Sequence, residues 1–189
     1  MSSPFPDPAA DQPARPPLIR REGPGDAAAI DEVHTAAFGA LAAAGSGAAE
    51  VALVHALRRD AGWIPQLALV AEDGAGTVVG HVVCTRGSLP VGSAVGLGPI
   101  GVHPAHQGNG VGSALMHAAL GAADALDFDV VVLVGHLDYY PRFGFVPARR
   151  LGITSTDASW GDHFQARALS RWTADVGGEF RYAAPFSAI

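Results

Sequence analysis

The chain has 189 residues, 49% of them hydrophobic, and a formal net charge of −6, which suits one acidic domain with a full apolar core. All 12 basic residues are arginines, and they form no stripe with interleaved aromatics, which argues against nucleic acid as a partner. A single cysteine excludes an internal disulfide framework and a Cys-rich zinc site. No apolar run is long enough for a membrane span, so we expect a cytoplasmic protein with no membrane partner.

The N-terminal segment differs in composition from the rest of the chain. Residues 1–17 contain six prolines and little that a core could bury, which predicts a disordered arm ahead of one domain over residues 18–189. Residues 18–22 predict a first strand that ends at the Gly-Pro-Gly turn of residues 23–25. Asp26 is placed to cap a helix whose apolar positions keep helical spacing, namely Ile30, Val33, Ala37 and Phe38.

The next part of the chain combines one helix with three strands. A linker of small residues over 39–47 precedes a second helix from about residue 48 to residue 59. Its apolar face contains Leu53, Val54 and Leu57. Three strands are predicted at residues 67–72, 78–85 and 94–102, the first two joined by a hairpin turn at 73–76.

A glycine-rich turn over residues 103–110 separates the last of these strands from a helix that begins at Val111. A helix N-terminus has free N–H groups and the positive end of the peptide dipole, and glycines let the backbone approach an anion closely, so the turn is predicted to bind phosphate. It matches neither the dinucleotide-binding fingerprint nor a P-loop. The apolar stripe predicted for the helix is Val111, Leu115, Ala119, Ala122 and Leu126.

The last third of the chain predicts further strands. Residues 130–134 form a continuous apolar run rich in β-branched residues, as in a strand buried on both faces. Residues 164–169 and 180–184 are expected to be closing strands. An early hairpin and late antiparallel strands favour a mixed α/β sheet over a doubly wound parallel one.

Two motifs in this chain resemble those of the GNAT superfamily of N-acetyltransferases. The acetyl-CoA pyrophosphate loop of that superfamily, Gln/Arg-x-x-Gly-x-Gly/Ala, is matched by Gln107, Gly110 and Gly112. The segment Tyr-x-x-x-Gly-Phe after the fifth strand is matched by Tyr140, Gly144 and Phe145. The residues around the second motif are similar to the YhbS-like subgroup of predicted acetyltransferases, and the resemblance runs from about residue 18 to the end.

This resemblance implies the GNAT fold, a mixed and mostly antiparallel sheet flanked by helices, with strands four and five splayed to admit the pantetheine arm. It implies acetyl-CoA as co-substrate, while the scattered histidines indicate no metal site. The residues that it implies for cofactor binding are Ile100, Gly101, Val102, Gln107, Gly108, Asn109, Gly110, Val111, Gly112 and Ser113.

Acyl transfer from a thioester to an amine needs a neutral amine, a donor for the developing oxyanion and an acid for the departing thiolate. Tyr140 is the candidate acid, because a GNAT would place its phenol at the sulfur end of the slot. In the alternative interpretation, Tyr140 is a half-buried aromatic that packs against Phe143 and Phe145. The neighbouring Tyr139 is expected to pack or to line the substrate pocket.

Glu50 is the candidate base, since it shares a helical face with apolar residues and an acid there needs a partner or a cavity. The alternative is a first-turn glutamate that interacts with the helix dipole. His34 is expected in the core or at its rim, and Cys84 in the core instead of acting as a nucleophile.

Further polar residues lie near the two motifs. His136 and Asp138 follow the fifth strand and could reach the acceptor, although Asp138 could instead be a helix N-cap. His103 and His106 flank the phosphate loop and are expected to assist anion binding or to face solvent.

These features favour an acetyltransferase in which a primary amine of a small molecule attacks acetyl-CoA directly in a ternary complex. A protein amine is the next acceptor considered. A non-catalytic acyl-CoA-binding sensor is the alternative from a different functional class. Many relatives form dimers, which leaves a homodimer open.

Overall fold

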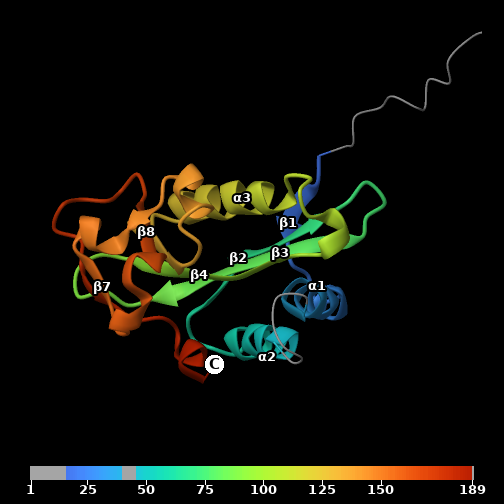
Figure 1. Ribbon diagram of the computed structural model, residues 1–189, viewed down its shortest axis with the longest axis horizontal. Helices are drawn as coiled ribbons and strands as arrows, with labels where there is room; N and C mark the ends of the chain where they lie inside the picture. Colours follow the sequence, from blue (N-terminus) through green and yellow to red (C-terminus); the bar gives the residue numbers. More distant parts are fainter. Residues whose placement is uncertain (1–15, 40–45, 189) are drawn as a thin grey trace, which may run out of the picture.

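The computed structural model describes residues 16–39 and 46–188, so the predicted arm lies outside it except for its last two residues. A seven-stranded sheet forms the centre, with α3 on one face and α1 and α2 on the other (Figure 1). The predicted mixed α/β class is therefore confirmed. The three α-helices are α1 (Ala27–Gly39), α2 (Ser46–Leu57) and α3 (Val111–Ala125).

The strands of the large sheet lie in the order β1-β2-β3-β4-β5-β8-β6, and β7 and β9 form a separate pair. The strand bounds are β1 Leu18–Arg21, β2 Trp63–Glu72, β3 Val78–Gly87, β4 Ala94–Val102, β5 Val130–Val134, β6 Val146–Pro147, β7 Ile153–Ser155, β8 Phe164–Ala168 and β9 Gly178–Phe180. Five short 3-10 helices connect them: η1 Pro104–His106, η2 Tyr140–Phe143, η3 Ala148–Leu151, η4 Ala158–His163 and η5 Ala184–Ala188.

β4 and β5 are parallel, whereas the other neighbours in the large sheet are antiparallel. The two strands pair only from Ala94 opposite Val130 to Gly96 opposite Val132. β4 then continues to Val102 without β5 as a partner, which is the predicted splay. It leaves backbone groups of the second half of β4 available on that edge.

A bulge bends β4 at the point where it leaves β5. Val82 pairs with Ile100 and Cys84 with Leu97, so that Gly98 and Pro99 together oppose the single residue Val83. An extra residue of this kind bends the strand and increases its twist. The Gly98–Pro99 peptide bond is cis. The bulge therefore turns the open half of β4 away from β5.

The helix α3 covers one face of the sheet with an apolar stripe. Six of its buried residues belong to the largest core cluster of the described residues, Val111, Leu115, Met116, Ala119, Leu120 and Ala123. The predicted stripe is confirmed as far as Ala119 and is wrong at Leu126, which is 38% exposed. Leu126 is the C-cap, where the chain already leaves the helix and no longer follows its buried face.

The segment from β1 to the start of α1 is fixed to β2 by ion pairs of Arg20. The main-chain carbonyl of Asp26 accepts the first helical hydrogen bond of α1, from Ile30 N–H at 2.9 Å. Its carboxylate does not cap the helix as predicted; it accepts from Gly23 N–H and pairs with Arg20. Arg20 also pairs with Glu72 of β2, so one guanidinium connects β1, β2 and the entrance of α1.

The predicted linker over residues 39–47 is helical at both ends, since Gly39 belongs to α1 and Ser46 and Gly47 belong to α2; residues 40–45 lie outside the described part. A Cβ atom at Gly47 would lie 2.8 Å from the Cα of Thr35. The backbones of α1 and α2 therefore approach closely at Gly47, which a larger residue would prevent.

The closing strand predicted over residues 180–184 is also wrong. Phe180 ends β9, which runs parallel to β7, and Arg181 forms only an isolated antiparallel bridge with Ser88. Phe180 and Tyr182 do alternate toward the interior as in a strand, and their rings lie 4.8 Å apart. The chain then turns into η5, which packs beside α2 near the C-terminus (Figure 1). The other predicted strands and the hairpin turn are confirmed, with β2 beginning at Trp63.

Candidate active site

A cavity of about 470 Å³ opens where β4 separates from β5. Its walls come from the bulged half of β4, the end of β5, both N-terminal helices, η4 and the C-terminal segment. The lining residues are Phe38, Glu50, Leu53, Leu97, Gly98, Pro99, Ile100, Val134, Gly135, His136, Tyr140, Trp160, Tyr182 and Phe186. The cavity thus brings together Tyr140 and Glu50, the two predicted catalytic residues, from segments 90 residues apart.

Tyr140 is the first residue of η2 and stands directly over the end of β5. A Cβ atom at Gly135 would lie 2.0 Å from the Tyr140 ring, so only glycine permits this approach. The ring also packs against Phe145 and Tyr139, at centroid distances of 6.0 and 5.1 Å. Burial raises the pKa of the phenol to about 12, and Tyr139 adds to the shift. The packing interpretation is therefore confirmed, because the ring is fixed by its neighbours. The hydroxyl stays protonated at neutral pH, and its use as the acid stays a prediction.

Glu50 lies in the second turn of α2 and points into the cavity beside Leu53. Its Oε2 atom is buried and has no hydrogen-bond partner among the described residues. A helix dipole acts within about the first turn, and α2 has no acidic residue there, so the helix-dipole interpretation is wrong. A carboxylate oxygen buried without a partner is costly unless a ligand supplies a donor. Glu50 is thus suited to receive an N–H group of a bound molecule.

The glycine-rich turn leads from η1 into α3 as predicted. Gly108 and Gly110 have φ values of 78° and 80°, in the left-handed region that favours glycine, and a Cβ atom at either would meet no atom within 4 Å. The first helical hydrogen bond joins Ala114 N–H to the Gly110 carbonyl at 2.9 Å, so the N–H groups of residues 111–113 have no partner within the helix. The turn is open toward solvent, as an anion-binding turn must be.

The Gln107 side chain positions the turn. Its Nε2 donates to the Val102 carbonyl at 2.9 Å, which fixes the turn to the end of β4. Gln107 therefore holds the position of the turn relative to the open edge of β4. Its main-chain N–H group donates to the Pro104 carbonyl at 3.3 Å and is thus engaged within the turn.

Comparison with known proteins decides the family. The acetyltransferase (GNAT) domain family matches residues 65–147, a range that contains the turn and Tyr140. The chain is 30% identical to the GNAT N-acetyltransferase YhbS of Escherichia coli in complex with CoA, with a TM-score of 0.82 and coverage of 94% of this chain and 95% of YhbS. The chain belongs to the GNAT family. A GNAT acetyltransferase from Brucella melitensis in complex with acetyl-CoA is 34% identical, with a TM-score of 0.71 and coverage of 90% and 97%.

A curated relative of this GNAT protein is YjhQ of Escherichia coli K12, an uncharacterized N-acetyltransferase. The two are 36% identical over 126 residues. This match spans 65% of the length of each protein. The family and the splayed GNAT fold are therefore established, and the acceptor is not identified by these relatives.

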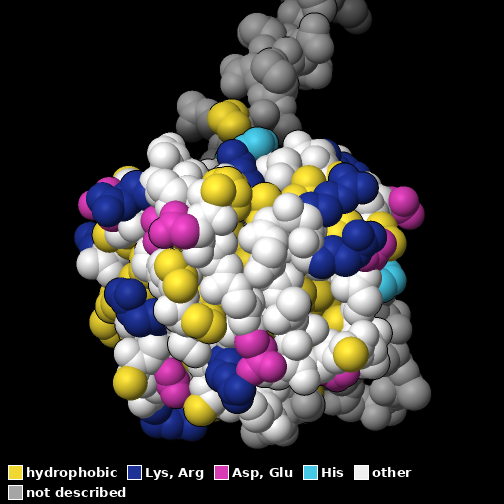
Figure 2. Space-filling view, turned by 90° about the vertical axis from the view of Figure 1, so that its left-hand side faces the viewer, with side chains coloured by type: hydrophobic (Ala, Val, Ile, Leu, Met, Phe, Trp, Pro, Cys, Tyr) yellow, Lys and Arg dark blue, Asp and Glu magenta, His cyan; other side chains and the backbone are white. Residues whose placement is uncertain are grey.

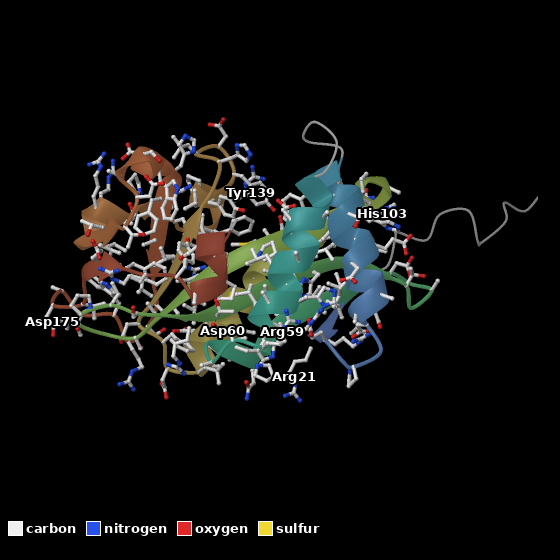
Figure 3. All side chains as sticks on the ribbon, turned by 90° about the horizontal axis from the view of Figure 1, so that it is seen from below. Arg21, Arg59, Asp60, His103, Tyr139 and Asp175 are labelled. Atoms are coloured by element: carbon white, nitrogen blue, oxygen red, sulfur yellow. The ribbon has the colours of Figure 1, made fainter. Side chains whose placement is uncertain are left out.

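Other predicted polar residues of this GNAT protein are only partly at the site. His136 lines the cavity. Asp138 is exposed, and it is not the cap of η2, which starts after Tyr139 without a side-chain cap. His103 uses Nδ1 to accept from Ala105 N–H at 3.3 Å and thus shapes η1. Figure 3 shows Tyr139 and His103 on one edge of the molecule and Arg21, Arg59 and Asp60 on the opposite edge.

Tyr139 packs and does not line the cavity. Its ring stacks in a tilted arrangement on Phe143 at 5.4 Å, and the Arg142 guanidinium lies 4.6 Å from its centroid. A Cβ atom at Gly112 would lie 2.9 Å from its hydroxyl oxygen, so Tyr139 also contacts the start of α3. Of the two uses predicted for this residue, packing is the one that the structure confirms.

Sequence reasoning missed the aromatic wall of the cavity. Trp160, Tyr182 and Phe186 come from the C-terminal third of the chain, where the pattern is weak. Tyr182 lies between the other two, at 6.0 Å from Trp160 and 4.7 Å from Phe186. A Cβ atom at Gly96 would lie 2.5 Å from the Tyr182 ring, so the ring packs onto β4 itself. Burial raises the pKa of Tyr182 well above its usual value.

Sequence reasoning also missed a buried polar chain beneath α1. His34 is confirmed as a core residue; its Nε2 lies 2.8 Å from Nδ1 of His81, and Nε2 of His81 lies 3.1 Å from a Glu22 oxygen. Arg58 donates to the same carboxylate at 2.9 Å. Burial lowers the pKa of both histidines, so both imidazoles are neutral. Nε2–H of His81 then donates to Glu22, and Nδ1 of His81 accepts from His34. Nδ1 of His34 has no partner among the described residues.

Acid should unfold this protein through that chain. Burial, followed by the charge that His81 gains on protonation and the charge of Arg58, lowers the pKa of His34 to about 3, and burial lowers the pKa of His81 as well. The unfolded chain binds these protons near pH 6.5, so the free energy of unfolding should fall as pH drops from about 6.5 toward 3. His34 alone contributes at most about 1.4 kcal/mol per pH unit in that window.

Urea unfolding at pH 7.5 and pH 5 measures this effect. His34→Gln should reduce the difference between the two pH values. His117→Gln is the control, because it removes an exposed histidine of α3 and should leave the difference in place. An equal free energy of unfolding at both pH values in the parent protein would contradict the prediction.

Cys84 is confirmed as a core residue, since it is fully buried and burial raises the pKa of its thiol to about 12. Among residues 16–39 and 46–188, no group of three His, Cys, Asp or Glu side chains is placed to hold a metal ion. Within the same residues, every helix is too short or too polar to cross a membrane. Figure 2 shows arginines beside acidic side chains on one face of the molecule. Ion pairs of this kind include Arg149–Asp162 and Arg181–Glu179.

Proposed function

We propose that this protein transfers an acetyl group from acetyl-CoA to a primary amine of a small molecule, by direct attack in a ternary complex. One observation carries the proposal: the cavity at the open half of β4 is lined both by Tyr140 and by the unpartnered carboxylate oxygen of Glu50. The relatives in complex with CoA and acetyl-CoA support the co-substrate. A cytoplasmic location, as expected from the sequence, is part of this proposal.

The cofactor is assigned to the turn and to β4. The free N–H groups of residues 111–113, with those of residues 108–110, would hold the pyrophosphate at the positive end of α3. The backbone of Ile100 and Val102, on the open edge of β4, would hydrogen-bond the pantetheine amides. Gly110 leaves room for the anion because its φ of 80° and open surroundings keep side-chain atoms away.

The reaction forms no covalent enzyme intermediate. Glu50 accepts one proton from the bound ammonium, the neutral nitrogen attacks the thioester carbonyl, and the C–N bond forms. The C–S bond then breaks, and the Tyr140 phenol gives its proton to the departing sulfur. The nitrogen loses its second proton as the amide forms, and this proton restores the Tyr140 phenol. Cys84 is buried in the core with a raised pKa, so a ping-pong reaction through this thiol does not fit.

A panel of amines with acetyl-CoA tests the proposal, with release of CoA thiol as the measurement. Turnover with small primary amines is the expected result. Turnover only with peptides would show that the acceptor is a protein amine and that the proposed small-molecule acceptor is wrong. A protein that binds acetyl-CoA but releases no CoA with any amine would be the non-catalytic sensor, and the enzymatic proposal would be wrong.

Glu50→Gln tests the proposed base. The amide is nearly isosteric with the carboxylate but cannot take a proton, so kcat should fall by roughly 10²-fold, or KM for a cationic amine should rise, with acetyl-CoA affinity unchanged. Glu32→Gln is the control, because Glu32 is an exposed carboxylate of α1 that does not line the cavity. Unchanged kcat and KM in Glu50→Gln would remove Glu50 from the mechanism.

A further inference from the structure

The acceptor end of the cavity has an unusual composition for a site that receives a charged molecule. Beyond the β4 and β5 edge, its walls are Phe38, Leu53, Trp160, Tyr182 and Phe186, with Glu50 as the one carboxylate of the lining. The other ionisable side chains in the lining are those of His136, Tyr140 and Tyr182. The wall therefore offers one negative charge and a broad apolar and aromatic surface.

The aromatic part of this wall is held in place by packing. Trp160 lies 5.9 Å from Phe164, and Tyr182 packs on Phe180, so each ring is supported from behind by a buried phenylalanine. Phe186 is in turn supported by the cluster of Leu53, Leu57 and Ala183. A fixed aromatic wall binds an apolar body by burial and adds an attraction for a nearby cation through the ring faces.

We infer that the acceptor is a monoamine: one ammonium joined by a short chain to an apolar, preferably aromatic, body, without a carboxylate. This inference rests on the proposed function and names its substrate class. The ammonium would bind the unpartnered Oε2 of Glu50, and the body would lie against Trp160 and Phe186.

Charge at a second place on the acceptor would be disfavoured. A diamine of similar length would bring its second ammonium against the aromatic wall, away from Glu50, and a buried charge without a partner is costly. An α-amino acid would place its carboxylate next to that of Glu50, where like charges repel. Both classes are therefore excluded by the same two features, the single carboxylate and the apolar wall.

Matched acceptors test the inference: 2-phenylethylamine, phenylalanine, 1,4-diaminobutane and ethylamine. We expect kcat/KM for 2-phenylethylamine to exceed the values for phenylalanine and 1,4-diaminobutane by roughly tenfold or more, because each of these adds an unpaired charge. Equal or better use of either charged acceptor would overturn the inference.

Two tryptophan variants distinguish an effect on acceptor binding from a general loss of stability. Trp160 and Trp172 both pack against the same buried cluster, but only Trp160 lines the cavity. Trp160→Ala should raise KM for 2-phenylethylamine roughly tenfold and leave KM for ethylamine unchanged. Trp172→Ala should change neither. A KM for 2-phenylethylamine that responds equally to both variants would contradict the proposed wall.

Binding keeps this test independent of turnover. Calorimetric titration of the protein–CoA complex should show binding of 2-phenylethylamine and none of phenylalanine, with binding weakened in Glu50→Gln. Selective binding without turnover would support the acceptor class and overturn the proposed reaction. Turnover with a different selectivity would support the proposed reaction and overturn the acceptor class. Binding of phenylalanine as tight as that of 2-phenylethylamine would also overturn the acceptor class.

Discussion

Tyr140→Phe should lower kcat by roughly 10²-fold or more while acetyl-CoA still binds with parental affinity. The substitution keeps the ring that packs against Gly135 and Phe145 and removes only the hydroxyl. Without it, the departing thiolate has to take its proton from water. Steady-state release of CoA thiol, with an amine found by the panel, measures the effect.

The neighbouring tyrosine is the matched control. Tyr139→Phe also removes one hydroxyl from the same aromatic group, but Tyr139 does not line the cavity, so kcat should stay within about threefold of the parent. The pKa of Tyr140, raised to about 12 by burial and by Tyr139, also predicts that loss of its proton does not limit the rate below about pH 11. A Tyr140→Phe rate equal to that of Tyr139→Phe would mean that another group protonates the sulfur.

The parts of the site that could be predicted are those that local sequence determines. A strand followed by a glycine-rich turn and a helix fixes the position of Gly110 relative to α3 within a dozen residues. Tyr140 lies six residues beyond the end of β5, and it is a candidate because Tyr140, Gly144 and Phe145 resemble a GNAT motif. Each of the two motifs is short and lies in one stretch of the sequence, so its position does not depend on contacts between distant segments.

The parts that could not be predicted depend on contacts between distant segments. Glu22 and His81 are 59 residues apart, and no local pattern indicates that β1 brings this carboxylate to a histidine of β3. The aromatic wall joins η4 and η5 to β4 in the same way. Only the chemistry gave a hint: Glu50 on an apolar helical face requires a partner or a cavity, and the cavity is what the structure provides.

The bulge in β4 lies between these cases. Gly98-Pro99 within a predicted strand is a local signal, since proline cannot donate to the ladder and glycine often marks a bulge. Its consequence is not local, because the splay also requires β5 to end at Val134 and β8 to continue the sheet on the far side. The position of a bend can be predicted from such a pair, and the cavity that it opens cannot.

Gly110→Asp should abolish cofactor binding. Gly110 is the N-cap of α3, with φ of 80°, and asparagine and aspartate tolerate this left-handed conformation better than other non-glycine residues. The fold should therefore survive, while a carboxylate is placed at the proposed pyrophosphate site. Repulsion between like charges at close range is worth several kcal/mol, so the Kd for acetyl-CoA should rise by at least about 100-fold.

Gly110→Asn separates the effect of charge from that of shape. Asparagine has the same size as aspartate and tolerates this conformation equally well, but it has no charge. We expect it to weaken acetyl-CoA binding much less than Gly110→Asp does. Gly112→Asp is a less clean test, since its Cβ atom would also meet the hydroxyl of Tyr139 at 2.9 Å. The measurement is the rise in melting temperature with acetyl-CoA, which follows from ligand linkage. If Gly110→Asp retained the parental rise, the pyrophosphate would have to bind elsewhere, because no anion could remain at this turn beside the new carboxylate without a loss of affinity.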